Sequence, residues 1–169
     1  MPPHFRVQTG FGVMAALAAF FTTAGQAQAA TSTATFAVQV SITATCTINS
    51  AGTLNFGSVG LLSANTDQTS TIQVTCTNTT PYNIGLDAGT GTGATVATRK
   101  LTSGSKTINY TLYSDSGRTT VWGNTISSNT VAATGSGAAQ NYTVYGRTPA
   151  QTTPAPGSYS DTITVTVTY

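Results

Sequence analysis

Two short stretches of the chain place residue types that could do chemistry close together. Ser103 and Lys106 fit the S-x-x-K spacing of a serine nucleophile with a lysine partner, and "AGTGTGAT" (88–95) is as rich in glycine as a phosphate-binding loop. S-x-x-K brings its side chains to one face on a helix, but here it runs into strand-like sequence and lacks S-D-N and K-T-G companions. The loop matches neither G-x-G-x-x-G nor the P-loop pattern, and no helical pattern follows it. We therefore predict no catalytic residue, no cofactor and no enzyme activity.

From residue 30 onward the chain contains no His and no Glu, which leaves few candidate metal ligands. The charged residues of this part are four acids and five bases, which give a net charge of +1. They are Asp67, Asp87, Asp115, Asp161, Arg99, Lys100, Lys106, Arg118 and Arg147. Scattered carboxylates without imidazole predict no metal site. So few basic residues also offer no clustered surface for nucleic acid.

Cys46 and Cys76 are the two cysteines of the chain. In an oxidising compartment, an even pair without a nearby His is typical of one disulfide bond. Closing a loop of this size would stabilise the fold by roughly 3 to 4 kcal/mol in the chain-entropy picture. Two separate buried thiols are the alternative.

The first 29 residues have the order of a secretory signal peptide. Arg6 precedes an apolar run from Phe11 to Phe21, and small residues with an A-x-A pattern end at Ala29. The apolar run is shorter than the roughly 20 residues that a membrane-spanning helix needs. We expect an exported chain that begins near Ala30 and does not insert directly into a membrane.

Apolar and polar residues alternate repeatedly in the exported part, and no stretch has the apolar stripe of a helix. This alternation predicts strands at 34–48, 52–60, 69–77, 81–89, 106–115, 140–150 and 157–169. Short strands at this spacing, separated by Gly, Pro, Asn and Ser, are typical of an immunoglobulin-like β-sandwich. The predicted fold class is therefore all-β.

The first and last predicted strands are unusual for such a sandwich. The first, 34–48, has no turn after it that would begin a hairpin, and the last runs to the end of the chain with Ile163, Val165, Val167 and Tyr169 in alternation. A sandwich that is one strand short exposes an apolar sheet edge. We predict that Phe36, Val38, Val40 and Ile42 of one molecule fill the edge of the next by strand addition. The alternative is that 34–48 forms a long first strand within its own sandwich.

Four stretches follow one another along the chain: "TCTINSAGTLNFGSVG", "TIQVTCTNTTPYNIGLDAG", "INYTLYSDSGRTTVWG" and "YTVYGRTPAQTTPAPGSYSDTITVTVTY". Together they resemble the spore coat protein U domain family, which includes the subunits of archaic (Csu-type) chaperone–usher pili. The resemblance implies an incomplete sandwich at 44–169, preceded by a donor segment at 30–43. On this likeness Cys46 and Cys76 match the family's disulfide, and the strand ending at Tyr169 matches the one that a chaperone grips.

The resemblance also implies a function and partners. The chain would be a structural subunit of an adhesive, biofilm-supporting surface fibre, carried through the periplasm by a chaperone and assembled at an outer-membrane usher with identical or related subunits. The alternative is a secreted spore-coat or surface-binding domain that does not polymerise by strand exchange. Such a domain could bind carbohydrate through an aromatic patch. The candidate residues of that patch are Tyr110, Tyr113, Trp122, Tyr142 and Tyr145.

Overall fold

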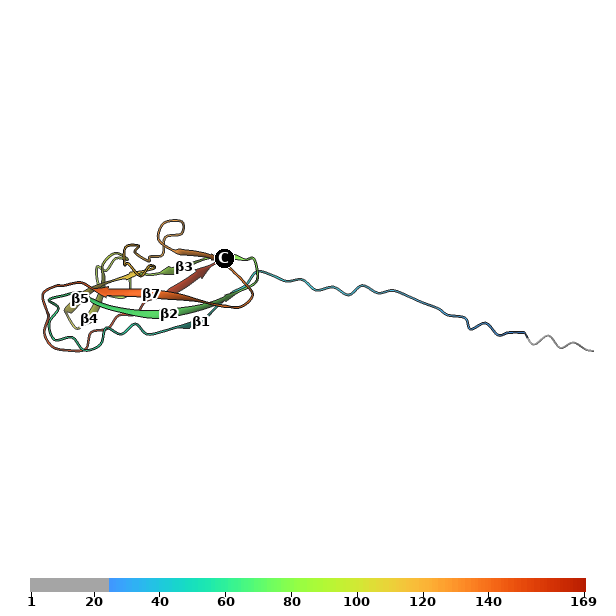
Figure 1. Ribbon diagram of the computed structural model, residues 1–169, viewed down its shortest axis with the longest axis horizontal. Coiled ribbons are helices and arrows are strands. Elements are labelled where there is room, and N and C mark those ends of the chain that lie inside the picture. The colour runs from blue at the N-terminus through green and yellow to red at the C-terminus, as the bar shows by residue number, and fades with distance from the viewer. Residues whose placement is uncertain (1–24) are drawn as a thin grey trace, which may run out of the picture. The chain divides into compact units, whose positions relative to one another are not determined.

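The computed structural model of the chain describes residues 25–169, so most of the predicted signal peptide lies outside the described residues. The chain divides into two units at Gln39 and Val40; the described part of the first, residues 25–39, is drawn as an extended thread in Figure 1, and the second is Val40–Tyr169. In the first unit, residues 25–39 are exposed and carry neither helix nor strand. The strands described below all lie in the second unit. Within 25–169 there is no helix with the length and apolarity to cross a membrane.

The second unit is built from two antiparallel sheets. Its strands are β1 (Cys46–Ala51), β2 (Thr66–Cys76), β3 (Pro81–Leu86), β4 (Arg99–Ser103), β5 (Lys106–Tyr113), β6 (Val131–Thr134), β7 (Ala139–Thr148) and β8 (Val165–Thr168). One sheet has the order β1-β2-β7-β5-β4, and the other has the order β6-β3-β8. The chain therefore crosses between the sheets at the β2–β3, β3–β4, β5–β6, β6–β7 and β7–β8 connections.

The core lies between these sheets because alternate residues of each strand point inward. Ile72 and Val74 of β2 face the core from one sheet, and Tyr82 and Ile84 of β3 face it from the other; all four are buried. Trp122, from the β5–β6 connection, fills the space between the sheets, and its indole N–H donates to Ile84 O at 2.8 Å. The predicted all-β, immunoglobulin-like fold class is confirmed.

Three predicted strands differ from the observed ones. Residues 34–45 carry no strand, so the first strand begins at Cys46. Residues 52–60 form an irregular connection instead of a strand, because Gly57 takes a positive φ of 77° and its amide bonds to the side chain of Asn55. The last strand begins at Val165 rather than Gly157, because side-chain carboxylates bind the preceding amides, as described below. The strands β4 and β6 were not predicted, since neither has a clear alternation.

Candidate strand-addition site

The predicted donor residues are the most exposed large apolar side chains in the described chain. Phe36 is 87% exposed, Val38 84%, Val40 87% and Ile42 77%. They alternate with the small or polar residues Ala37, Gln39 and Ser41. If this segment became a β-strand, all four apolar side chains would lie on one face. The structure does not bring them to a partner, so their role as a donor stays a prediction.

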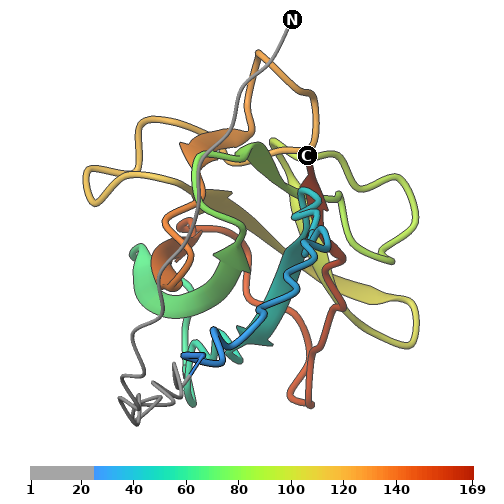
Figure 2. The ribbon, with the colours of Figure 1, turned by 90° about the vertical axis from the view of Figure 1, so that its right-hand side faces the viewer.

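Two sheet edges lie next to each other in the second unit. β1 ends the five-stranded sheet and β8 ends the three-stranded sheet, and the two strands approach each other without forming a ladder (Figure 2). In the part of the chain that the structure describes, β1 pairs only with β2, and β8 pairs only with β3. Each strand thus presents one row of main-chain N–H and C=O groups that a further strand could pair with.

Side chains on the core face of these two edges are incompletely covered. Ile48 of β1 lies opposite Val74 of β2, so the two point to the same face, yet Ile48 is 37% exposed and Val74 is 0% exposed. Likewise Val167 of β8 lies opposite the fully buried Ile84 but is itself only half-buried. The core side chains of β2 and β3 are therefore fully covered, whereas those of the edge strands β1 and β8 remain partly exposed.

The other predicted edge residues follow the same pattern. Ile163 and Val165 pack against the core while remaining half-buried, and Tyr169 is 59% exposed. Thr166 and Thr168 alternate with them and face away from the core. The structure thus collects the apolar residues of the chain's end along one edge, although Ile163 lies just before β8 and Tyr169 just after it.

Two carboxylates hold the chain where it enters β8. Asp161 accepts hydrogen bonds from the Tyr110 hydroxyl at 2.7 Å and from the Thr90 amide at 2.8 Å. Asp87 accepts from the Thr164 amide at 3.0 Å. Burial raises the pKa of Asp87, but the hydrogen bonds from Thr164 and a nearby glycine amide outweigh it and leave this pKa below its usual range. The Thr164 amide bound to Asp87 and the Thr162 amide, which donates to Asp161 at 2.8 Å, are thereby occupied and do not extend the strand, which explains its late start.

Arg99, the first residue of β4, is buried next to this region. Its guanidinium donates to four main-chain carbonyls, those of Leu86 at 3.0 Å, Asp87 and Trp122 at 2.8 Å, and Val96 at 2.9 Å. Burial lowers the pKa of Arg99. The guanidinium therefore joins the end of β3, the β3–β4 loop and the β5–β6 connection. In the sequence Arg99 stands out only as one of the five basic residues from residue 30 onward, and no periodicity marks it as an inward-facing residue.

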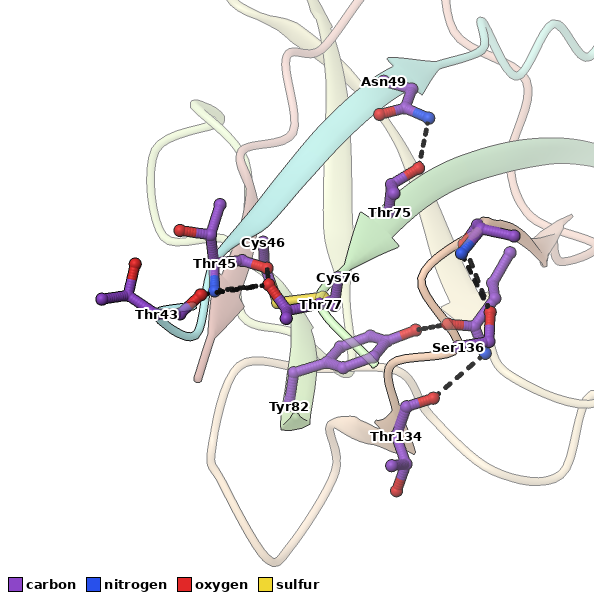
Figure 3. The surroundings of a disulfide bond; sticks show 12 residues. Thr43, Thr45, Cys46, Asn49, Thr75, Cys76, Thr77, Tyr82, Thr134 and Ser136 are labelled. Atoms are coloured by element: carbon purple, nitrogen blue, oxygen red, sulfur yellow. Dashed lines mark hydrogen bonds between the residues drawn. A yellow bond between two sulfur atoms is a disulfide. The ribbon is translucent and has the colours of Figure 1, made fainter. Parts of the chain in front are cut away.

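The disulfide expected from the cysteine count is present between Cys46 and Cys76, whose Cα atoms lie 4.1 Å apart (Figure 3). Beside it, the Thr77 hydroxyl accepts from the Thr45 amide at 3.1 Å, and the Thr77 amide donates to Thr45 O at 2.9 Å. The hydroxyl also lies 3.3 Å from Thr43 O, to which it can donate. These contacts fix the point at which the exposed segment joins the sandwich.

The residues considered for catalysis do not form the arrangement that their spacing would give on a helix. Ser103 ends β4 and Lys106 begins β5, so the two lie opposite each other across a tight hairpin turn. The glycine-rich stretch forms the β3–β4 loop and packs against Asp161. Among the described residues no three His, Cys, Asp or Glu side chains come close enough to hold a metal ion.

Two of the residues considered for an aromatic, carbohydrate-binding patch, Trp122 and Tyr110, are buried in the core. Two other tyrosines of this set already contact a neighbouring side chain. The Tyr142 hydroxyl contacts Tyr82, and the Arg118 guanidinium lies 5.8 Å from the centroid of the Tyr145 ring. The aromatic residues therefore serve packing between and on the sheets rather than forming one open stacking surface.

Comparisons with known proteins agree with this architecture. The chain matches the Spore Coat Protein U domain over residues 32–166. It is 32% identical over 158 residues to Protein U of Myxococcus xanthus, and the match covers 85% of this chain and 88% of that protein. It is also similar to a chain in the crystal structure of the CsuC–CsuE chaperone–tip adhesion subunit pre-assembly complex from archaic chaperone–usher Csu pili of Acinetobacter baumannii, with a TM-score of 0.55 and 26% identity. That likeness covers 76% of this chain but only 40% of the solved chain. These matches confirm the resemblance expected from the sequence: the chain belongs to the Spore Coat Protein U domain family.

Proposed function

We propose that this protein is a structural subunit of a chaperone–usher surface pilus, which polymerises head-to-tail by donor-strand exchange. The observation that carries the proposal is the pair of complementary exposures in one chain. Four alternating apolar side chains of the segment 36–42 are 77–87% exposed, and the core faces of β1 and β8 are incompletely covered. Strand addition would bury both at once.

The energetic gain of such a joint can be estimated from the exposed side chains. Burying each of the four would stabilise the joint by about 1.5 to 3 kcal/mol, or roughly 6 to 12 kcal/mol in total, before ordering costs and hydrogen bonds. The segment gains main-chain partners from the rows of N–H and C=O groups on β1 and β8. Because the donor segment and the acceptor edges are different parts of the chain, the contact is head-to-tail, and it extends as a filament where its rotation does not close a ring.

The same exposures account for the proposed partners. An unfilled apolar edge favours aggregation, so the subunit needs a periplasmic chaperone to cover β8 until a donor arrives. The solved complex to which this chain is similar is a chaperone–subunit complex. In this scheme residues 1–29 are removed on export, residues 30–43 become the donor segment, and residues 44–169 form the acceptor domain. An outer-membrane usher would then order the exchange and release an adhesive, biofilm-supporting fibre at the cell surface.

The donor segment offers a matched pair of substitutions to test this function. Val38→Asp would push an unpaired charge into an apolar contact, which is costly. Gln39→Asp adds the same charge on the opposite face of a strand. We expect Gln39→Asp to give fibres of normal length, whereas Val38→Asp and deletion of 31–42 give chaperone-bound monomer and at least tenfold less fibre in sheared cell-surface material.

Mixed expression separates a donor defect from a folding defect. A Val38→Asp subunit keeps β1 and β8, so it can still accept a donor although it cannot provide one. In cells that also make the native subunit, an epitope-tagged Val38→Asp chain should therefore appear only at fibre ends in immunogold micrographs. Labels along the shaft, or normal fibres from Val38→Asp alone, would favour the alternative of a secreted coat or binding domain that works without strand exchange.

A further inference from the structure

The disulfide lies at the point where the proposed donor segment enters the acceptor domain. Cys46 is the first residue of β1, Cys76 is the last residue of β2, and the two lie directly opposite each other. In a fibre, tension on a subunit would arrive along the chain through residues 43–45 and reach Cys46 before any other residue of the two sheets. The inference developed from this position rests on the proposed function.

Without a crosslink, this tension would be held only by β1 and by the exposed hydrogen bonds of Thr43 and Thr45 to Thr77. β1 is short, its register is interrupted between Ile48 and Ser50, and most of its residues are exposed. It pairs with a single neighbour within the described chain. It is also one of the two edges that would hold the next subunit's donor. Pulling β1 away from β2 would therefore open the acceptor site of the same subunit.

Cys76, in contrast, is tied to both sheets. It ends β2 in the five-stranded sheet, and a short turn connects it to β3 in the three-stranded sheet. The β6–β7 connection is bonded to this turn, because Gly137 N donates to Cys76 O at 3.0 Å and Thr79 N donates to Gly135 O at 2.8 Å. A carbon added at Gly135 would collide with the carbonyl oxygen of Thr77, so the two connections are in close contact. Cys76 is fully buried in the core.

We propose that the Cys46–Cys76 disulfide is a tension anchor, which transfers pulling force from the donor segment past β1 to the corner where both sheets meet. When the bond is oxidised, it keeps β1 in place, and the acceptor site keeps its donor strand while the fibre is under tension. Reduced, the same subunit transmits force through the β1–β2 hydrogen bonds, which separate one after another. The anchor makes the strength of the fibre depend on the redox state of its subunits.

The test is to pull native fibres between trapped beads before and after reduction by a phosphine. Alkylation of the released thiols and mass measurement establish that reduction is complete. We expect reduced fibres to yield at no more than half the force of oxidised ones. Each unfolding subunit should also lengthen by roughly 100 Å more, because reduction frees the chain between the cysteines to extend. Their sequence separation is 30 residues, and an extended chain spans about 3.3 to 3.6 Å per residue. Equal yield forces in fully reduced fibres would overturn the proposal.

Two controls make the remaining outcomes decisive. Fibres of a Cys46→Ala/Cys76→Ala subunit should yield at the low force with or without reductant, and a response to reductant there would show that the effect lies elsewhere. Reduced fibres should keep their length in micrographs when no force is applied; spontaneous disassembly would mean that the disulfide supports the fold itself, and the anchor would be rejected. Normal assembly by Val38→Asp would instead contradict the proposed function.

Discussion

Replacement of the buried Arg99 by methionine tests how the acceptor edge is supported. Arg99→Met keeps a long side chain but removes the charge and all donors. Four carbonyl oxygens, including that of Leu86 at the end of β3, would lose the guanidinium that now binds them. Because β3 is the partner of β8, loosening its end also loosens the strand that borders the proposed acceptor site.

The size of the effect follows from two opposing terms. Each hydrogen bond to a charged donor contributes about 1.5 to 3 kcal/mol, which sets an upper bound of roughly 6 to 12 kcal/mol for the four bonds. Removing the charge also ends its desolvation penalty of several kcal/mol. We therefore expect Arg99→Met to lower the free energy of unfolding by about 3 to 5 kcal/mol, a large share of the roughly 5 to 15 kcal/mol of an ordinary domain.

Urea unfolding of the chain without residues 31–42, which cannot polymerise by strand exchange, at concentrations low enough to prevent aggregation measures this loss directly. With a slope of about 1 to 3 kcal/mol per molar urea, the midpoint should fall by roughly 2 M. Arg99→Lys should lose most of the same stability, because a compact ammonium with three donors cannot reach four carbonyls at once. If the free energy of unfolding of Arg99→Met lies within about 1 kcal/mol of the native value, the relief of the desolvation penalty cancels the loss of the hydrogen bonds. The supporting role assigned to Arg99 would then be wrong.

Two further perturbations probe the packing and the charges of the sandwich. Gly135→Ala should lower the free energy of unfolding by about 1 to 3 kcal/mol because its new methyl group meets Thr77 O, whereas Gly60→Ala, with open space around it, should be neutral in the same melts. The hydrogen bond from Arg147 lowers the pKa of Asp67 from its usual 3.8. A lowered pKa stabilises the fold only while the carboxyl is ionised, so this contribution is complete above about pH 5 and is lost as the pH falls below about 4. Asp67→Asn should therefore reduce the loss of unfolding free energy between about pH 5 and lower pH. An unchanged pH dependence in this range would contradict the role given to the Asp67–Arg147 pair.

The sequence by itself determined the features that depend on residues adjacent in the chain or on the number of residues of one type. The alternation of apolar residues located β2, β5 and β7 to within a few residues, because the two faces of a strand follow from adjacent positions. Two cysteines left one intramolecular pairing. The apolar positions of 36–42 were also visible in the sequence, and their proposed role as a donor rests on them.

Only the tertiary structure decided which segments have partners. Leu54 and Phe56 alternate like strand residues and pack against the core, yet 52–60 joins no ladder. Arg99 is only one of the five basic residues from residue 30 onward, yet it is buried, because carbonyls of the preceding loop and of two more distant segments, the end of β3 and the β5–β6 connection, surround it. The meeting of β1 and β8 could not be predicted either, since they come from opposite ends of the sandwich sequence. Alternation states which side chains share a face, whereas a hydrogen-bonded neighbour is supplied by residues far away in the chain and is fixed only when the sheets fold together.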